Sequence, residues 1–309
     1  MYVLIINPVA GRGKGIKIVK EYLKGVQNPQ NYKSYYTEYP GHATKLVAQV
    51  VSLHEEKIEM LVVVGGDGTF YEVINGVKAY GDLPLAFVPV GSGNDFARGC
   101  SMPLDPKESL RTIFKQKRFQ SYWAGTYLTD GRPARLEKLF ASSLGIGFDA
   151  EVAERTNESK WKAWFNRIHL SFLVYVIGLI VTIFKFQPKN IHLTIDGKER
   201  ELKGIWMLTI TNHPYFGGGM KIAPDATINK QTFHVTIVHQ ISKLKLLLLF
   251  ITVFFGKHTR LKEVEMLKGS EIMVRSDESI IYHADGYTGK CYECHVRKEQ
   301  GPRRVVRKN

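Results

Sequence analysis

The stretch "VVVGGDGTFYEVINGV", residues 62–77, joins a β-branched run to a turn of three glycines and one carboxylate. The valines favour a buried strand, and Phe70, Val73, Ile74 and Val77 recur after the turn at helical spacing. Glycine lets backbone N–H groups approach an anion because no Cβ intervenes. A strand, a glycine turn and a helix in this order therefore predict a phosphate-binding corner at the end of a strand.

Two further turns of this kind occur in the first third of the chain. "NPVAGRGKG", residues 7–15, follows a predicted strand, and "PVGSGNDFARG", residues 89–99, follows another. Regular alternation of strands and helices predicts an α/β domain with a mostly parallel sheet. Since the carboxyl ends of parallel strands lie at one edge, the three turns are expected to share a rim. One glycine turn alone is most often only a turn, and neither a P-loop nor a dinucleotide pattern is present.

After about residue 125 the pattern changes to period-two runs separated by turn residues, such as "IHLTIDGKERE" and "KCYECHVRK". This alternation predicts an antiparallel, β-sandwich-like second domain. The predicted domains span residues 1–125 and 126–309, and the basic tail at 297–309 could pack back on the first domain. "CYECH" matches a haem-attachment pattern, but strict strand alternation would place Cys291 and Cys294 on opposite faces, so we do not predict haem.

The chain has 309 residues, and 43 Lys and Arg against 29 Asp and Glu leave a net charge of +14. This excess favours an anionic partner such as a nucleotide, an anionic membrane or nucleic acid. Nucleic acid is not predicted, because the cations are spread along the chain. The apolar runs at 170–184 and 246–255 are too short to span a bilayer, so each is expected to form a buried or interfacial helix or else to line an apolar cavity. No signal peptide is recognisable and only three cysteines occur, so we expect a cytoplasmic protein.

The three glycine turns resemble the catalytic domain shared by diacylglycerol kinases, sphingosine and ceramide kinases and bacterial lipid kinases. "TEYPGHATKLV" (37–47), "SLGIGFDAEV" (143–152) and "GGGMKIAPDA" (217–226) extend the resemblance over nearly the whole chain. The resemblance implies a nucleotide-binding domain at 1–125, a lipid-substrate domain at 126–309, and ATP with Mg²⁺ in the cleft between them. It further implies transfer of the γ-phosphoryl group to a lipid hydroxyl at an anionic membrane surface, with peripheral membrane association.

The resemblance also identifies the residues expected at this site. Asp67 would be catalytic and bind the Mg²⁺, with Asp285 as a second catalytic carboxylate. Lys14 and Arg98 are phosphate neighbours on charge grounds, and Asn94 with Asp95 could alternatively cap a helix. The residues matched to nucleotide binding are Asn7, Pro8, Gly11, Arg12, Thr37, Gly65, Gly66, Asp67, Gly68, Thr69, Glu72, Ser92 (where the family usually has Thr), Asn94 and Asp95.

Three departures from the family pattern affect the expected chemistry. Tyr287 occupies the place of the usual Glu base, and a tyrosine is a much poorer base at neutral pH. Tyr71 replaces the usual Asn beside the nucleotide cleft. The loop "ATINKQTF" (226–233) replaces one that holds a structural Mg²⁺. Its site at Thr227, Lys230 and Thr232 is expected to be degraded, with the Lys230 ammonium taking over the metal's charge.

These departures make diacylglycerol a doubtful substrate. Either Asp67 or Asp285 deprotonates the hydroxyl of another lipid, or the chain is a catalytically silent nucleotide- or lipid-binding homologue. An NAD kinase is a third alternative, because a bare "GGDGT" also occurs in that class. A homodimer through edge strands is compatible with the sequence as well.

Overall fold

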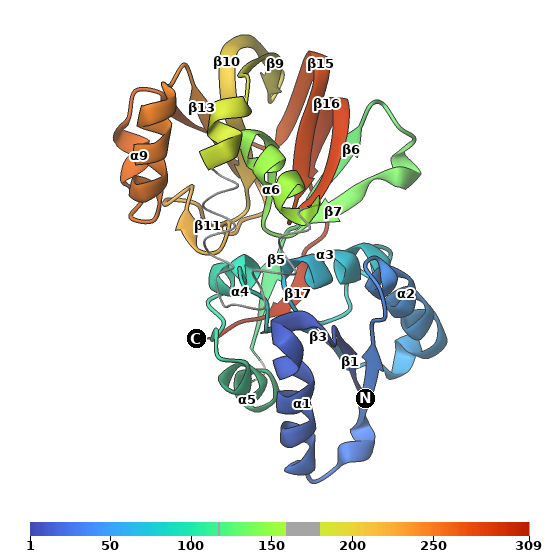
Figure 1. The fold of residues 1–309 in the computed structure, drawn as a ribbon. Coiled ribbons are helices and arrows are strands. Elements are labelled where there is room, and N and C mark those ends of the chain that lie inside the picture. The colour runs from blue at the N-terminus through green and yellow to red at the C-terminus, as the bar shows by residue number, and fades with distance from the viewer. Residues whose placement is uncertain (117, 159–179, 309) are drawn as a thin grey trace.

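The computed structural model describes residues 1–116, 118–158 and 180–308. The first domain is built on a six-stranded sheet in the order β2-β1-β3-β4-β17-β5 (Figure 1). β1 to β4 run parallel, as the alternating pattern predicted. The bounds are β1 (Tyr2–Ile6), β2 (Tyr32–Tyr36), β3 (Met60–Gly65), β4 (Leu85–Pro89), β5 (Phe119–Tyr122) and β17 (Arg303–Val306).

Helices cover both faces of this sheet. α1 packs against α5 on one face, and α2 packs against α3 on the other (Figure 1). The strands β3 and β4 are buried along their whole length because both faces are covered. The bounds are α1 (Lys14–Lys24), α2 (His42–His54), α3 (Asp67–Gly76), α4 (Asp95–Gly99), α5 (Pro106–Gln116), and the 3-10 turns η1 (Ala10–Gly13), η2 (Pro29–Asn31) and η3 (Glu55–Lys57).

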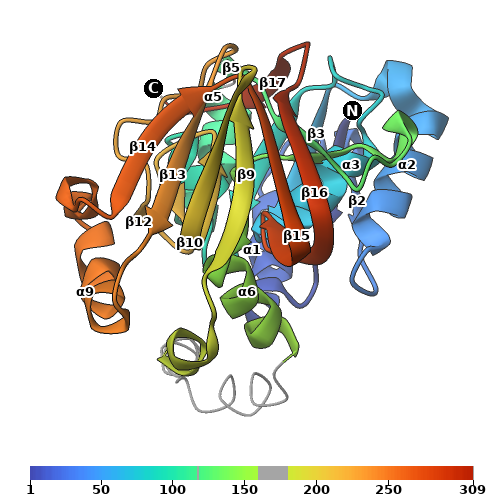
Figure 2. The same cartoon turned by 90° about the horizontal axis from the view of Figure 1, so that it is seen from above.

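The second domain is an antiparallel sheet of nine strands, which Figure 2 shows from above with α6 and α9 at its side. Eight of its strands follow the order β14-β13-β10-β8-β15-β16-β6-β7. The ninth strand, β9, also lies between β10 and β15 and pairs with both, at the opposite ends of these two strands from β8. The two long strands β10 and β15 therefore hold the sheet together. The predicted fold class, α/β followed by an antiparallel β-sandwich-like domain, is confirmed.

The strands of the second domain are β6 (Gly125–Thr129), β7 (Lys138–Phe140), β8 (Ser143–Gly147), β9 (Lys189–Ile195), β10 (Lys198–Thr211), β13 (Phe233–His239), β14 (Val264–Gly269), β15 (Glu271–Ala284) and β16 (Tyr287–Lys298), with a small hairpin of β11 (Tyr215–Phe216) and β12 (Met220–Lys221). The helical elements are α6 (Phe148–Glu158), α9 (Lys243–Val253), η4 (Ala134–Leu136) and η5 (Lys257–Arg260). The apolar run at 246–255 thus forms most of α9 and the turn after it. Most of the run at 170–184 lies outside the described residues.

The expectation that Cys291 and Cys294 lie on opposite faces of their strand is wrong. Both are buried in the same core of the second domain, and both are free thiols. The pairing of β15 with β16 shifts between Arg275 and Ile280. An irregularity of this kind breaks the two-residue period, so two residues three apart can face the same side.

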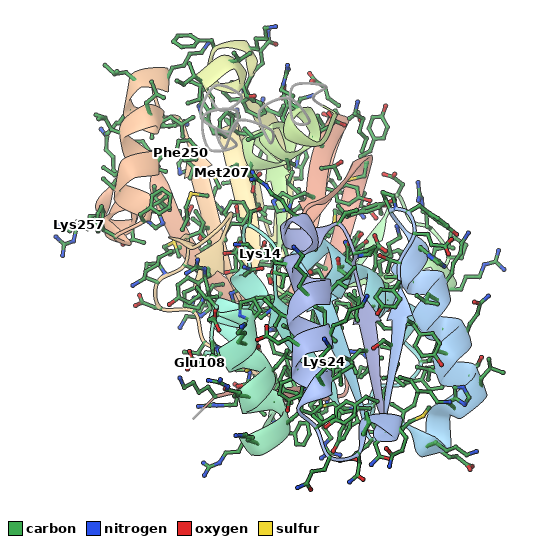
Figure 3. The ribbon with its side chains drawn as sticks, turned by 60° about the horizontal axis from the view of Figure 1, so that its bottom comes forward. Lys14, Lys24, Glu108, Met207, Phe250 and Lys257 are labelled. Carbon is green, nitrogen blue, oxygen red and sulfur yellow. The ribbon has the colours of Figure 1, made fainter. Side chains whose placement is uncertain are left out.

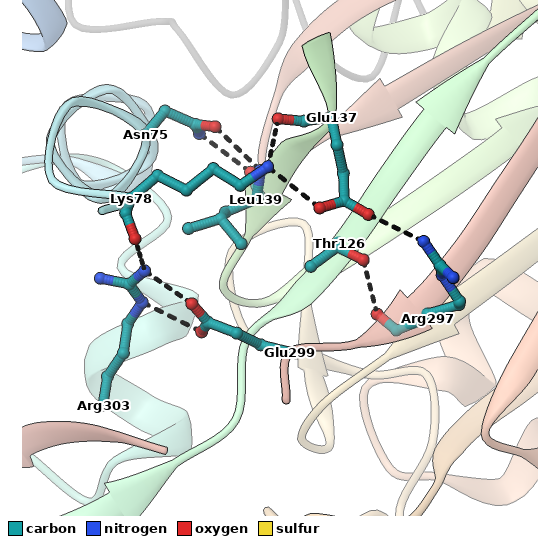
Figure 4. Close-up of polar contacts among 8 residues, drawn as sticks. All are labelled: Asn75, Lys78, Thr126, Glu137, Leu139, Arg297, Glu299 and Arg303. Atoms are coloured by element: carbon teal, nitrogen blue, oxygen red, sulfur yellow. Dashed lines mark hydrogen bonds and ion pairs between the residues drawn. The ribbon is translucent and has the colours of Figure 1, made fainter. Parts of the chain in front are cut away.

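The two domains are joined by α3 and by the returning C-terminal strand (Figure 4). Asn75 exchanges two hydrogen bonds with the backbone of Leu139 in β7, and Lys78 donates to the backbone oxygen of Glu137 at 2.7 Å. Arg303 is buried, donates to the carbonyl oxygens of Val77 and Lys78 at 3.2 Å, and pairs with Glu299.

Tyr71 also packs into the core of the second domain. The helix that begins at Asp67 is therefore held against the second sheet from several sides.

Candidate active site

The three glycine turns meet at one rim. A Cβ on Gly91 would lie 2.7 Å from the Cα of Gly66, so only glycine lets the second and third turns approach this closely. Gly11 has φ +56°, and a Cβ there would lie 2.5 Å from the carbonyl oxygen of Val90. Asn7 donates from Nδ2 to the Thr69 hydroxyl at 3.0 Å. The shared rim expected from the strand order is present.

Asp67 links the second turn to the third. Its carboxylate accepts the backbone N–H groups of Asp95 at 3.2 Å and Phe96 at 3.1 Å, which open α4. Burial raises the pKa of the Asp67 carboxyl above its ordinary value, and these N–H groups act in the opposite direction. The carboxylate is thus held in a fixed orientation at the rim while remaining partly accessible.

Asp95 extends the connection to the second domain. Its carboxylate accepts the N–H groups of Gly218 at 2.9 Å and Gly219 at 2.8 Å, in the turn of the β11–β12 hairpin. Burial, followed by repulsion from Asp67, raises the pKa of Asp95 to about 6. The Arg98 guanidinium lies beside the same turn, since a Cβ added to Gly219 would lie 3.2 Å from the Arg98 Cζ. The hairpin from the second domain therefore closes one side of the rim.

Asp285 lies in the turn between β15 and β16 and is buried. Its carboxylate accepts three backbone N–H groups, from Ala141 at 2.6 Å, Ser142 at 2.8 Å and Ser143 at 3.0 Å. Burial raises the pKa of Asp285 to about 6, and the charge of Asp67 contributes in the same direction. Asp285 therefore fixes the start of β8 and lies within electrostatic range of Asp67.

The two tyrosines that depart from the family pattern contact each other. The rings of Tyr71 and Tyr287 stack, with centroids 5.4 Å apart and planes at 18°. The Tyr71 hydroxyl is hydrogen-bonded to that of Tyr127 at 2.8 Å in the buried interior. The Lys138 ammonium lies 4.6 Å from the centroid of the Tyr287 ring, which is 50% exposed. Sequence reasoning noticed both replacements but not that they form a pair.

Other predicted residues take different positions. Glu72 caps the start of α2, because its carboxylate accepts the N–H groups of Gly41 at 2.8 Å and Ala43 at 3.0 Å. Thr37 is buried just after β2, where its N–H bonds to the carbonyl oxygen of Ile6. Ser92 is exposed on the third turn. Thr37 and Ser92 therefore lie at strand ends, whereas the Glu72 carboxylate faces α2.

Asn94 adopts a left-handed conformation with φ 57°, and its Nδ2 donates to the carbonyl oxygen of Gly91 at 2.9 Å. Its Oδ1 is buried and has no hydrogen-bond partner among the described residues. The loop at 227–232 is closed by the side chain of Asn229, whose Oδ1 accepts the N–H groups of Gln231 and Thr232 at 2.8 Å. Lys230 in that loop is exposed.

Among residues 1–116, 118–158 and 180–308, no three or more His, Cys, Asp or Glu side chains are grouped so that they could hold a metal ion. Asp67 and Asp95 both approach the position of a Gly93 Cβ, at 3.0 Å and 3.7 Å. Within these ranges, Asp67 and Asp95 therefore form the pair of carboxylates at the rim that could bind a cation.

A small apolar cavity of about 20 Å³ lies in the second domain beside the β11–β12 hairpin. One end is polar: the Asp149 carboxylate accepts the Thr209 hydroxyl at 3.1 Å and lies 3.4 Å from His283 Nε2. Figure 3 shows Met207 and Phe250, which both line the cavity, between the second sheet and α9. The cavity is lined by Phe148, Asp149, Val152, Met207, Phe216, Met220, Ile222, Leu249, Phe250 and Val253.

Sequence reasoning allowed the run at 246–255 to line an apolar cavity, as Leu249, Phe250 and Val253 do, but it did not identify the Asp149–His283 pair. "SLGIGFDAEV" was noticed as a motif, but nothing in it indicated that His283 would lie beside its aspartate. Phe216 packs on the His283 ring at 5.4 Å between centroids. Since Phe216 and Gly218 belong to the same hairpin, that hairpin both lines the cavity and contacts Asp95.

The fold and the rim define a two-domain kinase of the lipid kinase type, and comparison with known proteins agrees. Residues 1–121 match the diacylglycerol kinase catalytic domain, and residues 142–297 match the YegS C-terminal NAD kinase beta sandwich-like domain. The chain belongs to the lipid kinase family that combines these two domains, as the sequence motifs predicted. Members of this family are phosphotransferases that use ATP as co-substrate and an alcohol as acceptor.

Among curated relatives, the protein named "Putative lipid kinase YtlR" of Bacillus subtilis (strain 168) is 36% identical over 286 residues, which cover 91% of each chain. A diacylglycerol kinase of Mycobacterium tuberculosis is 26% identical over 283 residues, covering 91% of this chain and 87% of the relative.

Two solved structures share the fold. The first is a diacylglycerol kinase from Bacillus anthracis, with a TM-score of 0.69 at 19% identity over 99% of this chain and 96% of that one. The second is yeast NADH kinase, with a TM-score of 0.56 at 11% identity over 100% of this chain and 84% of that one. In the part of the chain that the structure describes, no helix combines the length and apolar character needed to cross a membrane.

Proposed function

We propose that this protein transfers the γ-phosphoryl group of ATP to a hydroxyl of a lipid other than diacylglycerol. The observation that carries the proposal is the contact of Asp95 with Gly218 and Gly219. This contact joins the rim of glycine turns to the hairpin that lines the apolar cavity. A nucleotide phosphate at the rim and the hydroxyl of a lipid beside the hairpin would then meet at Asp67.

The nucleotide would bind with its phosphates against the three turns. Phosphates favour helix N-termini and glycine-rich backbone, and α3 begins at Asp67, directly after Gly65 and Gly66. The Asn94 side chain orders the third turn of this rim, because its Nδ2 donates to the carbonyl oxygen of Gly91 at 2.9 Å. Asn7, Pro8, Gly11 and Arg12 would form the side of the site that belongs to the first turn.

Asp67 is the residue that would bind Mg²⁺. This ion is commonly held by one or two carboxylates together with substrate phosphates and water, so a pair of acidic side chains at a phosphate site fits it. Each carboxylate oxygen can accept more than one bond, and Asp67 is only partly buried. When bound, Mg²⁺ would neutralise charge that develops on the transferred phosphoryl group.

Asp67 is also the better candidate for contact with the acceptor hydroxyl. Asp285 already satisfies its carboxylate with three backbone N–H groups, so we assign it the role of a positioning residue that orders β8. Tyr287 is held by its stack on Tyr71 and offers a phenol instead of a base. Phosphoryl transfer tolerates this because its loose transition state depends mainly on positioning and charge stabilisation.

The acceptor would place its apolar chain against the side chains around this small cavity, which would have to open to admit it, with a polar group near Asp149 and His283. Because Tyr287 fills the position of the usual base with an aromatic ring, the headgroup would differ from that of diacylglycerol. The excess of positive charge favours an acceptor presented at an anionic membrane surface.

The test is incubation of radiolabelled ATP with a total lipid extract, comparing wild type with Asp67→Asn. The matched control is Asp82→Asn, the same change at an exposed loop residue. Wild type and control should label a lipid, and Asp67→Asn should lower the rate about a hundredfold or more. Labelling that survives Asp67→Asn would remove Asp67 from the mechanism.

Two other outcomes would overturn the lipid kinase proposal itself. An ATP-dependent rise in melting temperature without any labelled lipid would indicate a silent binding homologue. Labelling of NAD in the absence of lipid would indicate an NAD kinase.

A further inference from the structure

α9 is apolar on two sides. Its inner side is buried, with Leu246, Leu249 and Val253 packed in the second domain. Its outer side carries Leu244, which is 72% exposed, and Leu248, which is 57% exposed. An ordinary surface helix has one apolar side and one polar side, so the exposed leucines are not explained by the fold.

The exposed apolar surface continues beyond α9. Phe254 and Phe255 follow the helix, and Phe255 is 73% exposed. Phe184, from an earlier segment of the chain, is also exposed and is tied to the start of α9. Its carbonyl oxygen accepts the Lys243 ammonium at 2.8 Å, and the ammonium lies 5.8 Å from the centroid of its ring. We call Phe184, Leu244, Leu248, Phe254 and Phe255 the outer apolar face.

Positive charge surrounds this face. The stretch 240–262 contains Lys243, Lys245, Lys257, Arg260 and Lys262 and no Asp or Glu. Lys245 pairs with Glu263 at 2.7 Å, whereas Lys257, Arg260 and Lys262 are exposed. Figure 3 shows Lys257 projecting away from the body of the protein at the end of this region. Clustered apolar side chains bordered by cations are typical of a surface that enters an anionic lipid interface.

We propose that the outer apolar face docks the protein on an anionic bilayer. The inference rests on the proposed function, because it specifies how a lipid acceptor would reach the cavity. The inner side of α9 lines that cavity through Leu249, Phe250 and Val253. A bilayer against the outer side would therefore be separated from the cavity only by the helix itself, about 10 Å across.

The charge pattern favours a membrane over a protein partner. A protein–protein interface is depleted of lysine, and its rim is polar without an excess of one sign of charge being required. Here the stretch 240–262 carries five cations and no acid, and Glu263, the next residue, is paired with Lys245. The attraction of the remaining cations for anionic headgroups adds to the burial of leucine and phenylalanine side chains. Docking should therefore need both the apolar side chains and the anionic lipid.

The experiment is sedimentation of the full chain with vesicles in the absence of nucleotide. One set contains phosphatidylcholine with phosphatidylglycerol, and the other contains phosphatidylcholine alone. Wild type should bind the anionic vesicles more tightly than the phosphatidylcholine vesicles. This preference should shrink as the salt concentration increases. The double variant Leu248→Glu/Phe255→Glu should bind more than about tenfold more weakly, since two large apolar side chains are lost from the interface.

The matched control is Leu53→Glu, which places the same charge on an exposed leucine elsewhere. Leu53 belongs to α2, far along the chain from α9, and is 75% exposed. It should bind vesicles like wild type. The triple variant Lys257→Gln/Arg260→Gln/Lys262→Gln leaves the apolar side chains in place and should lose the preference for anionic vesicles. Melting temperatures verify that each variant folds.

The inference is overturned if the double variant binds vesicles like wild type. It is also overturned if the wild type is a dimer in solution and the double variant a monomer, because a second copy would then cover this face. Vesicle binding that depends on the face, together with no labelled lipid, would support docking while refuting the proposed kinase activity.

Discussion

Tyr71 and Tyr287 stack on each other across the domain boundary, with ring planes 18° apart. Tyr71 belongs to α3, one turn after Asp67, and Tyr287 opens β16. Each residue departs from the family pattern, and the structure shows that the two departures form one contact. An aromatic pair of this kind contributes about 0.5–1.5 kcal/mol beyond the burial of its surface. The pair therefore helps to hold the second domain in place beside the rim.

Tyr287→Phe should retain lipid phosphorylation within about threefold, because the ring stack remains and a phenol is not needed as a base. Tyr287→Leu should destabilise the protein by about 1 kcal/mol through loss of the stack. Initial rates with radiolabelled ATP and urea unfolding measure the two effects. A loss of activity of about a hundredfold in Tyr287→Phe would show that the hydroxyl takes part in the reaction.

Gly91→Ala should weaken nucleotide binding, because the added Cβ would collide with the backbone of Gly66 and force the second and third turns apart. The expected cost to stability is about 1–3 kcal/mol. Gly81→Ala is the control, since a Cβ at Gly81 meets nothing within 4 Å. The readout is the rise in melting temperature on adding ATP. Equal rises in both variants would show that the contact between the turns is not part of the nucleotide site.

Asp285→Asn should destabilise the protein at pH 7 by about 1–3 kcal/mol, because the amide presents one acceptor oxygen to three N–H groups. Its effect should depend on pH. The folded pKa is about 6 against an ordinary value of 3.8, so the native state binds a proton at higher pH than the unfolded state.

This difference means that wild type gains stability from Asp285 as the pH falls from about 7 to about 4, and the variant does not. Urea unfolding at several pH values in this window should therefore show the gap between the two proteins widening on acidification. A constant gap would mean that the Asp285 pKa is not raised.

Lys298→Met should change how the stability of the protein depends on pH above neutrality. The Lys298 ammonium donates to Asn212 and lies 4.2 Å from the centroid of the Phe233 ring. Burial lowers the pKa of Lys298 from 10.5 to about 7. The native state then releases its proton before the unfolded state does, so wild type should gain stability as the pH rises from about 7 to about 10.

The variant should lack that gain, and thermal unfolding at several pH values in this range measures the difference. Lys24→Met, at the exposed end of α1, is the control and should follow wild type. The same rise in wild type and Lys298→Met would contradict the assignment.

The sequence alone determined the parallel sheet, the antiparallel second domain and the shared rim of glycine turns. These features follow from local rules: side-chain periodicity decides between helix and strand, and parallel strands end at one edge. The family motifs lie in those turns, so they also identified the family. The same local rule failed at Cys291 and Cys294, because the register shift depends on the pairing of β15 with β16.

Only the tertiary structure decided which distant side chains meet. The stack of Tyr71 on Tyr287, the Asp95 contact with Gly218, and the Asp149–His283 pair each join segments far apart in the chain. It also showed that Asp285 is saturated by backbone N–H groups and that α9 exposes leucines on its outer side. Periodicity reports which face of an element is apolar, but contacts between elements depend on packing across the whole chain, which no local pattern contains.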